Sequence, residues 1–126
     1  MTYVLLDAGM VDAIHDAVLN PGELQGMAGD KSLDGALGRV DNRLVYGMIS
    51  DVFDLAAAYC VAVATGHVFN DANKRTAYKT MIVCLYMNGQ RIEHDTIEAG
   101  DLIREVAQRR MDEDDLAAWL RRKAAG

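Results

Sequence analysis

The side chains best suited to chemistry lie together in one short stretch, residues 66–76. It contains a histidine, an aspartate, two asparagines, a lysine and an arginine, and apolar segments lie on both sides of it. Polar side chains between buried elements are costly unless they find partners. The stretch therefore indicates a ligand site, and its adjoining lysine and arginine indicate a ligand that carries phosphate.

A helix that starts inside this stretch would supply an anion site. Asn70 and Asp71 are both residue types that cap helix starts, and the first amide hydrogens of a helix have no partner within it. Asn73 could donate to a phosphate oxygen, while Lys74 and Arg75 add positive charge. Arginine can also hold phosphate through two parallel hydrogen bonds.

Two more side chains of the stretch suit group transfer. Asp71 offers the hard oxygen ligand that Mg²⁺ takes alongside substrate phosphates. His67 has an ordinary pKa of about 6.5, which suits a general base that acts on a hydroxyl. Caps and exposed charges are common when taken singly, but here they converge within nine residues. Together they predict transfer of a phosphate or nucleotide, with Phe69 as an apolar anchor for the loop.

The rest of the chain is expected to position this stretch with helices. Apolar spacing predicts a first helix over residues 7–19, and Ser32 is a good cap for a second that runs to about 46. Ser50 is expected to cap a third helix, which is apolar on almost every side over 52–64 and therefore buried. Gly66 is a suitable C-terminal cap for this helix.

Three further helices complete the predicted fold. The fourth starts at Asn70 or Asp71 and closes at 88–89, the fifth covers 96 to about 109, and the sixth covers about 112–123. In the fifth, Ile97 is expected to face inward with Leu102, Ile103 and Val106. No segment shows strand alternation. We therefore predict an all-α fold, with residues 1–126 in a single compact domain of about six helices around the third and fourth.

Composition limits the function classes. The formal net charge is −6, which disfavours a general electrostatic grip on nucleic acid. The longest apolar run, residues 55–64, is too short to cross a bilayer, so no membrane partner is expected. Cys60 and Cys84 each lie in an apolar run, which suggests buried, reduced thiols. The N-terminus does not show the basic region followed by an apolar core that marks a signal peptide. Together with the buried thiols, this predicts a cytoplasmic protein.

Residues 67–75 resemble the Fic motif, His-x-Phe-x-(Asp/Glu)-(Gly/Ala)-Asn-(Gly/Lys)-Arg. The resemblance extends to the Asp-Leu-Ala-Ala-Ala-Tyr run before the motif and to Lys-Arg-Thr-Ala-Tyr and Met-Asn-Gly after its start, so that it covers most of residues 32–89. The usual motif has glycine at the place of Lys74 and a second arginine at the place of Tyr78. The lysine form is similar to the Doc (death-on-curing) branch, the toxins of phage-type toxin–antitoxin pairs.

The resemblance implies a role for each motif residue. In Fic proteins, part of a nucleotide is transferred to a hydroxyl side chain of a target protein. By this likeness His67 is the base, Asp71 holds Mg²⁺, and Asn73 forms an anion hole with the helix amides. Arg75 would contact phosphates, and Phe69 would anchor the loop in the core.

The Doc-like form further implies a particular reaction. ATP is expected to bind in the reversed sense, so that its γ-phosphate rather than AMP is transferred, with Lys74 beside the phosphates. The implied target is a threonine of elongation factor Tu, whose phosphorylation halts translation. The loop of residues 22–31 lies where the family has its target-positioning flap.

The chain lacks the sequence of the helix that restrains many Fic enzymes. That helix carries (Ser/Thr)-x-x-x-Glu-(Gly/Asn), and no glutamate here has serine or threonine four positions earlier. A toxic activity without an inhibitory helix in the same chain implies a separate antitoxin chain, as in the Phd–Doc pairing. We expect an amphipathic segment of a Phd-like antitoxin to dock in an apolar groove of this domain.

Three alternatives stay open at this point. The first is adenylylation of the target in place of phosphorylation. The second is a metal phosphohydrolase of the HD class, suggested by the His-Asp pairs at 15–16 and 94–95, to which His67 and Asp71 could add ligands. A catalytic metal site, however, needs a converging set of ligands. The third is a non-catalytic binding module, against which the intact His67, Asp71 and Asn73 weigh.

Overall fold

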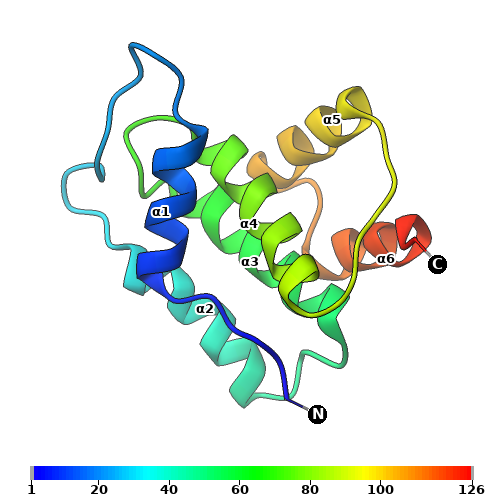
Figure 1. Cartoon of the computed structure of the whole chain (residues 1–126). Helices are drawn as coiled ribbons and strands as arrows, with labels where there is room; N and C mark the ends of the chain where they lie inside the picture. The colour runs from blue at the N-terminus through cyan, green and yellow to red at the C-terminus, as the bar shows by residue number, and fades with distance from the viewer. Residues whose placement is uncertain (1, 126) are drawn as a thin grey trace.

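The computed structural model describes residues 2–125, in which six helices make up the fold (Figure 1). In chain order they are α1 (Ala8–Val18), α2 (Leu33–Val45), α3 (Val52–Gly66), α4 (Asn73–Met87), α5 (Thr96–Ala107) and α6 (Glu113–Lys123). The described residues contain no strand, only two isolated bridges between extended residues. The predicted all-α fold is therefore confirmed. None of these helices has the length and apolarity needed to cross a membrane.

Helix α3 is the centre of the molecule. Every residue from 55 to 65 is buried, and α3 packs against α2, α4, α5 and α6, most extensively against α4. Figure 1 shows α3 and α4 side by side, with α1 and α2 on one side and α5 and α6 on the other. Since α3 ends and α4 begins within the polar stretch, the short loop between them is fixed at both ends to the core.

The start of α3 differs from the prediction. The cap is Asp51, whose Oδ1 accepts a hydrogen bond from the Asp54 amide at 2.9 Å, and not Ser50. The Asp54 carboxylate reaches back to accept from the Ser50 amide at 2.9 Å. Arg121 of α6 donates to Asp51 at 2.8 Å and to Asp54 at 2.6 Å. Both carboxylates therefore gain a cationic partner, which a serine at the cap could not match.

One residue of the predicted core is on the surface. Ile97 was expected to face inward, but it is 78% exposed. Leu102, Ile103 and Val106 are buried as predicted. Five residues of helix separate Ile97 from Leu102, which places them about 140° apart around the axis. Helix α5 packs on α3 and α4, and Ile97 is not among its buried residues, so the prediction for Ile97 was wrong.

A buried carboxylate ties α6 to α2. Glu113 is 5% exposed, and its Oε2 accepts from Arg39 Nε at 2.9 Å and lies 3.6 Å from Arg43 Nη1. Burial alone would raise the Glu113 pKa, but the hydrogen bond from Arg39 and the charge of both arginines outweigh it and lower this pKa. The Glu113 carboxylate is thus held in its charged form at neutral pH.

Glu113→Gln is expected to lower the free energy of unfolding by about 1–3 kcal/mol at pH 7, because two arginines lose their anion. The native pKa of Glu113 lies below its ordinary value of 4.5. Its stabilisation is therefore complete above that value and is lost as pH falls through the native pKa. Urea unfolding over a pH series measures both effects. Asp115→Asn, an exposed change on the same turn, should stay within about 0.5 kcal/mol at pH 7, and equal losses in both variants would contradict the prediction.

Candidate active site

The polar stretch forms a tight loop with a left-handed residue at each end. His67 follows α3 with φ 49°, and Ala72 precedes α4 with φ 64°. The prediction of Gly66 as the C-terminal cap was wrong, since Gly66 is still helical. A Cβ on Gly66 would lie 3.2 Å from the Ala36 Cβ, so glycine there serves the close approach of α2 to α3. His67 consequently takes the left-handed position, a strained one for a residue other than glycine.

Helix α4 begins later than predicted, at Asn73 in place of Asn70 or Asp71. Those two side chains bind the loop after α1. Asn70 Nδ2 donates to the Gln25 carbonyl at 3.1 Å, and Asp71 Oδ2 accepts from the Leu24 amide at 2.9 Å. No side chain caps α4. The first amides of the helix, at residues 73–75, therefore remain available to an anion.

The carboxamide of Asn73 closes the loop on itself. Its Oδ1 accepts from the Phe69 amide at 3.1 Å, and its Nδ2 donates to the Phe69 carbonyl at 2.9 Å. The Phe69 ring is 2% exposed and stacks on the His15 ring, with centroids 3.8 Å apart. The Asn73 side chain thus shapes the loop, and its backbone amide is one of the groups left for an anion.

His15 is a residue of the site that the sequence prediction missed. It is fully buried on α1, and its Nε2 lies 2.9 Å from the Asp71 carbonyl oxygen. A carbonyl oxygen only accepts hydrogen bonds, so His15 Nε2 carries the proton. The contact joins α1 to the loop. Val11, four residues earlier on the same helix, is also buried, and this spacing was a signal that His15 faces the core.

Arg75 is held by the segment that follows α1. Its Nη1 donates to the Val18 carbonyl at 2.6 Å, and its Nη2 forms an ion pair with Glu23 Oε2. The hydrogen bond from Arg75 lowers the Glu23 pKa, and the same bond raises the Arg75 pKa. Glu23 is a second residue that the prediction missed, and a single glutamate in a glycine-containing loop gave no sequence signal for it.

The predicted chemical groups share one cavity of about 390 Å³. The residues that line it include all five predicted ones, His67, Asp71, Asn73, Lys74 and Arg75, and also Glu23. His67 and Lys74 are exposed and the others partly exposed. The cavity thus combines an imidazole, a carboxylate, two cations and free helix amides, which is the set that phosphoryl transfer uses.

Tyr78 lies one turn further along α4 and outside this cavity. Its hydroxyl is 2.7 Å from His94 Nε2, and burial raises the Tyr78 pKa. Lys74, Arg75 and Tyr78 also line an adjoining cavity of about 240 Å³ against α5. Lys74 and Arg75 therefore line both neighbouring cavities, whereas Tyr78 lines only the one against α5.

The metal ligands of an HD-type site do not converge. Over residues 2–125, the only group of three or more potential metal-binding side chains is Asp12, His15 and Asp16 on α1. His67 is not part of that group, and His94 forms a hydrogen bond with Tyr78. The two His-Asp pairs in the sequence therefore serve separate parts of the structure.

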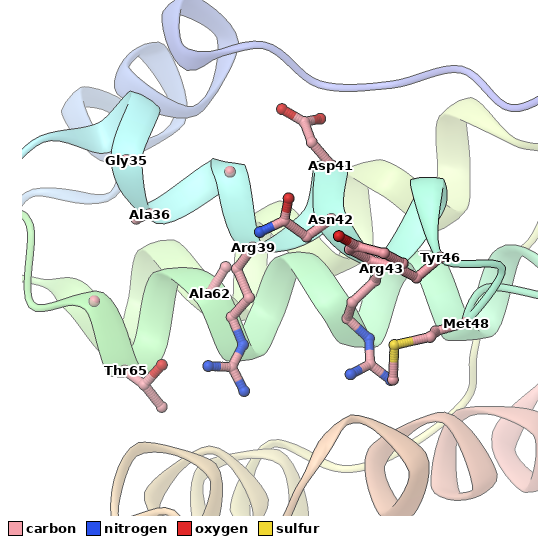
Figure 2. Close-up of a pocket in the computed structure, with 12 residues that line it drawn as sticks. Gly35, Ala36, Arg39, Asp41, Asn42, Arg43, Tyr46, Met48, Ala62 and Thr65 are labelled. Carbon is pink, nitrogen blue, oxygen red and sulfur yellow. The ribbon is translucent and has the colours of Figure 1, made fainter.

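A larger cavity, about 670 Å³, lies along α2 and α3 (Figure 2). Gly35, Gly38 and Ala62 are among the small residues that line it. Figure 2 shows Arg39 and Arg43 extending from α2 across α3, and both pair with the buried carboxylate of α6 described above. None of the predicted catalytic or phosphate-binding residues lines this cavity.

The fold and the loop together define a class of protein: an all-helical domain in which a short polar loop joins the two central helices and opens on a cavity. The sequence profile of the Fic/DOC family matches residues 5–85, which include α1 to α3, the loop and most of α4. The chain belongs to the Fic/DOC family.

Two similar proteins within this family are both named as Doc proteins. The chain is 40% identical over 111 residues to the protein kinase doc of Escherichia phage P1, and the match covers 87% of each chain. It is 38% identical over 92 residues to the toxin Doc of Mycolicibacterium smegmatis, with 70% of each chain covered. Both matches agree with the resemblance to the Doc branch found in the sequence.

Proposed function

We propose that this chain is a Doc-like toxin that transfers the γ-phosphate of ATP to a hydroxyl side chain of a translation protein. The proposed target is a threonine of elongation factor Tu, and the proposed result is arrest of translation. The observation that carries the proposal is the convergence of His67, Asp71 and the two cations on one cavity at a helix start. The similarity to a relative named as a protein kinase supports it.

The proposed reaction follows from the atoms that the cavity presents. His67 takes the proton from the target hydroxyl, whose oxygen forms a bond with the γ-phosphorus of ATP. The bond from that phosphorus to the bridging oxygen breaks, and ADP leaves. His67 is exposed, so a hydroxyl on a protein surface can reach it.

The remaining residues would hold the nucleotide. The amides at residues 73–75, with Lys74 and Arg75, would bind phosphate oxygens. Asp71 has one carboxylate oxygen bonded to the Leu24 amide, and its other oxygen suits Mg²⁺, which takes a protein carboxylate together with phosphates and water. When bound, Mg²⁺ would neutralise charge on the phosphates.

Two positions support γ-transfer over adenylylation. Lys74 adds a charge at the start of α4, beside the proposed phosphate site. Tyr78 stands where the usual motif has a second arginine, and it does not line the cavity that holds His67. The site thus gains one cation and lacks another, which supports the reversed nucleotide orientation described for Doc-like proteins.

Labelled ATP separates the possible activities. The purified chain is incubated with a cell extract, Mg²⁺ and ATP labelled at either the γ- or the α-phosphate. We expect the γ label on a protein the size of elongation factor Tu, with the threonine located by mass spectrometry, and none with His67→Ala. Transfer of the α label would instead indicate adenylylation, and no label from either ATP would refute the enzyme proposal.

An antitoxin is the proposed partner, and the cavity along α2 and α3 is its proposed docking groove. Its small residues would allow a helix to approach closely, as in helix-in-groove recognition. Tyr46 and Met48, 77% and 51% exposed, stand at one end as apolar anchors. A Cβ on Gly38 would meet nothing within 4 Å, so Gly38→Trp should fold and fill the groove. It should remain toxic in cells that also make the antitoxin, and rescue equal to that of the native chain would refute this groove.

A further inference from the structure

The segment after α1 lies directly on the motif loop. Residues 20–31, here called the flap, follow α1 and pass beside the loop that joins α3 and α4 (Figure 1). Met27 and Phe69 form an antiparallel bridge. The Ala28 amide donates to the Val68 carbonyl at 2.7 Å, and the Asn70 amide donates to the Gly26 carbonyl at 3.2 Å. The flap is thus seated like a short strand along the loop.

Two consecutive flap residues contact the groups that the proposed reaction needs. The Glu23 carboxylate is paired with the Arg75 guanidinium, and the Leu24 amide donates to the Asp71 carboxylate at 2.9 Å. Carboxylate and phosphate oxygens use the same N–H donors of an arginine. In the described structure the flap therefore already fills part of the position proposed for the phosphates.

The charge balance of the cavity also indicates that Glu23 competes with a phosphate. Glu23 and Asp71 offset Lys74 and Arg75 while the flap is seated, so the cavity has little net attraction for a polyanion. If the Glu23 carboxylate moves away, one positive charge is uncovered beside the free amides of α4. That state suits a nucleotide phosphate far better than the seated one.

Movement of the turn at the start of the flap would disturb little of the core. The Glu23 side chain is 23% exposed and the Arg75 side chain 41% exposed. Glu23 stands in a turn in which its amide donates to the Asn20 carbonyl at 3.1 Å and its Oε1 accepts from the Asn20 amide at 2.6 Å. This turn is on the surface, so it can shift without opening the packing of α3 and α4.

We infer that Glu23 is an internal competitor of the nucleotide: its carboxylate occupies Arg75 until a phosphate displaces it and the turn of residues 20–24 at the start of the flap shifts. The inference rests on the proposed function. It makes Glu23 a residue that sets nucleotide affinity and couples nucleotide binding to movement of the segment that faces the protein target.

Binding of a non-hydrolysable ATP analogue with Mg²⁺, measured by calorimetry, tests the competition. Glu23→Gln keeps an oxygen for the Asn20 amide but removes the charge that competes, so it should bind the analogue about three- to tenfold more tightly than the native chain. Asp30→Asn removes the same charge from an exposed flap residue that makes no contact with Arg75, and it should leave affinity unchanged. Equal or weaker binding by Glu23→Gln would overturn the inference.

Hydrogen exchange of the flap amides gives a second readout that needs no nucleotide. Without ligand, Glu23→Gln should exchange faster than the native chain over residues 22–24, because the ion pair that holds this turn against Arg75 is gone. If neither protein binds the analogue but exchange rises, the proposed function fails while the seating role of Glu23 stands. Unchanged exchange together with unchanged affinity would reject the role of Glu23 alone.

Discussion

Replacing His67 by asparagine is expected to reduce phosphate transfer by about 10²–10⁴-fold, the usual contribution of a general base. Asparagine cannot take the proton of the target hydroxyl at neutral pH. It does tolerate the left-handed backbone that His67 adopts at φ 49°, and His67 is exposed. Stability should therefore hardly change. The rate of γ-label incorporation and a urea unfolding curve on the same preparation measure the two effects separately.

His94→Asn is the matched control for this change. His94 is partly buried and bonded to Tyr78, and it does not line the cavity that holds His67. This variant should transfer phosphate at close to the native rate. A His67→Asn protein that keeps more than a tenth of the native rate would show that another group takes the proton.

The second large effect is expected on stability. Phe69→Ala should lower the free energy of unfolding by about 3–5 kcal/mol, because a buried aromatic ring leaves a cavity that the surroundings cannot fill. The ring is 2% exposed and loses its stacking on His15, itself fully buried. Urea unfolding at neutral pH measures the loss.

Phe69→Leu keeps most of the buried volume and serves as the comparison. It should cost clearly less than Phe69→Ala, since a leucine fills part of the same space even though it cannot stack. Equal losses would show that the flat ring against His15, and not the filled volume, holds the loop. A loss below about 1 kcal/mol for alanine would mean that the loop is anchored elsewhere.

Much of the helical fold could be predicted because its signals are local. The apolar run of α3 and the serine cap of α2 act within a few residues, so both helices were found. The start of α4 could not be predicted in this way. Asn70 and Asp71 are good caps by type, but their side chains bind flap residues 43–47 positions away in the chain. A tertiary partner therefore overrode a local preference.

The candidate site shows the same limit. His67 to Arg75 lie within nine residues, so their shared cavity follows once the loop is short and fixed at both ends. His15 and Glu23 lie 56 and 52 positions before their partners in the loop. No spacing rule connects residues at such separations, and only the packing of α1 and the flap against the loop reveals them.

The buried cysteines make the native chain a convenient background for a site-specific probe. Cys60 and Cys84 are each 0% exposed, and burial raises the pKa of both thiols to about 12. Thiol reagents react with the exposed thiolate, so the folded chain offers them no target. A cysteine introduced at Leu24, which is 62% exposed on the flap, would then be the sole reactive thiol, and a dye attached there could follow the flap in real time.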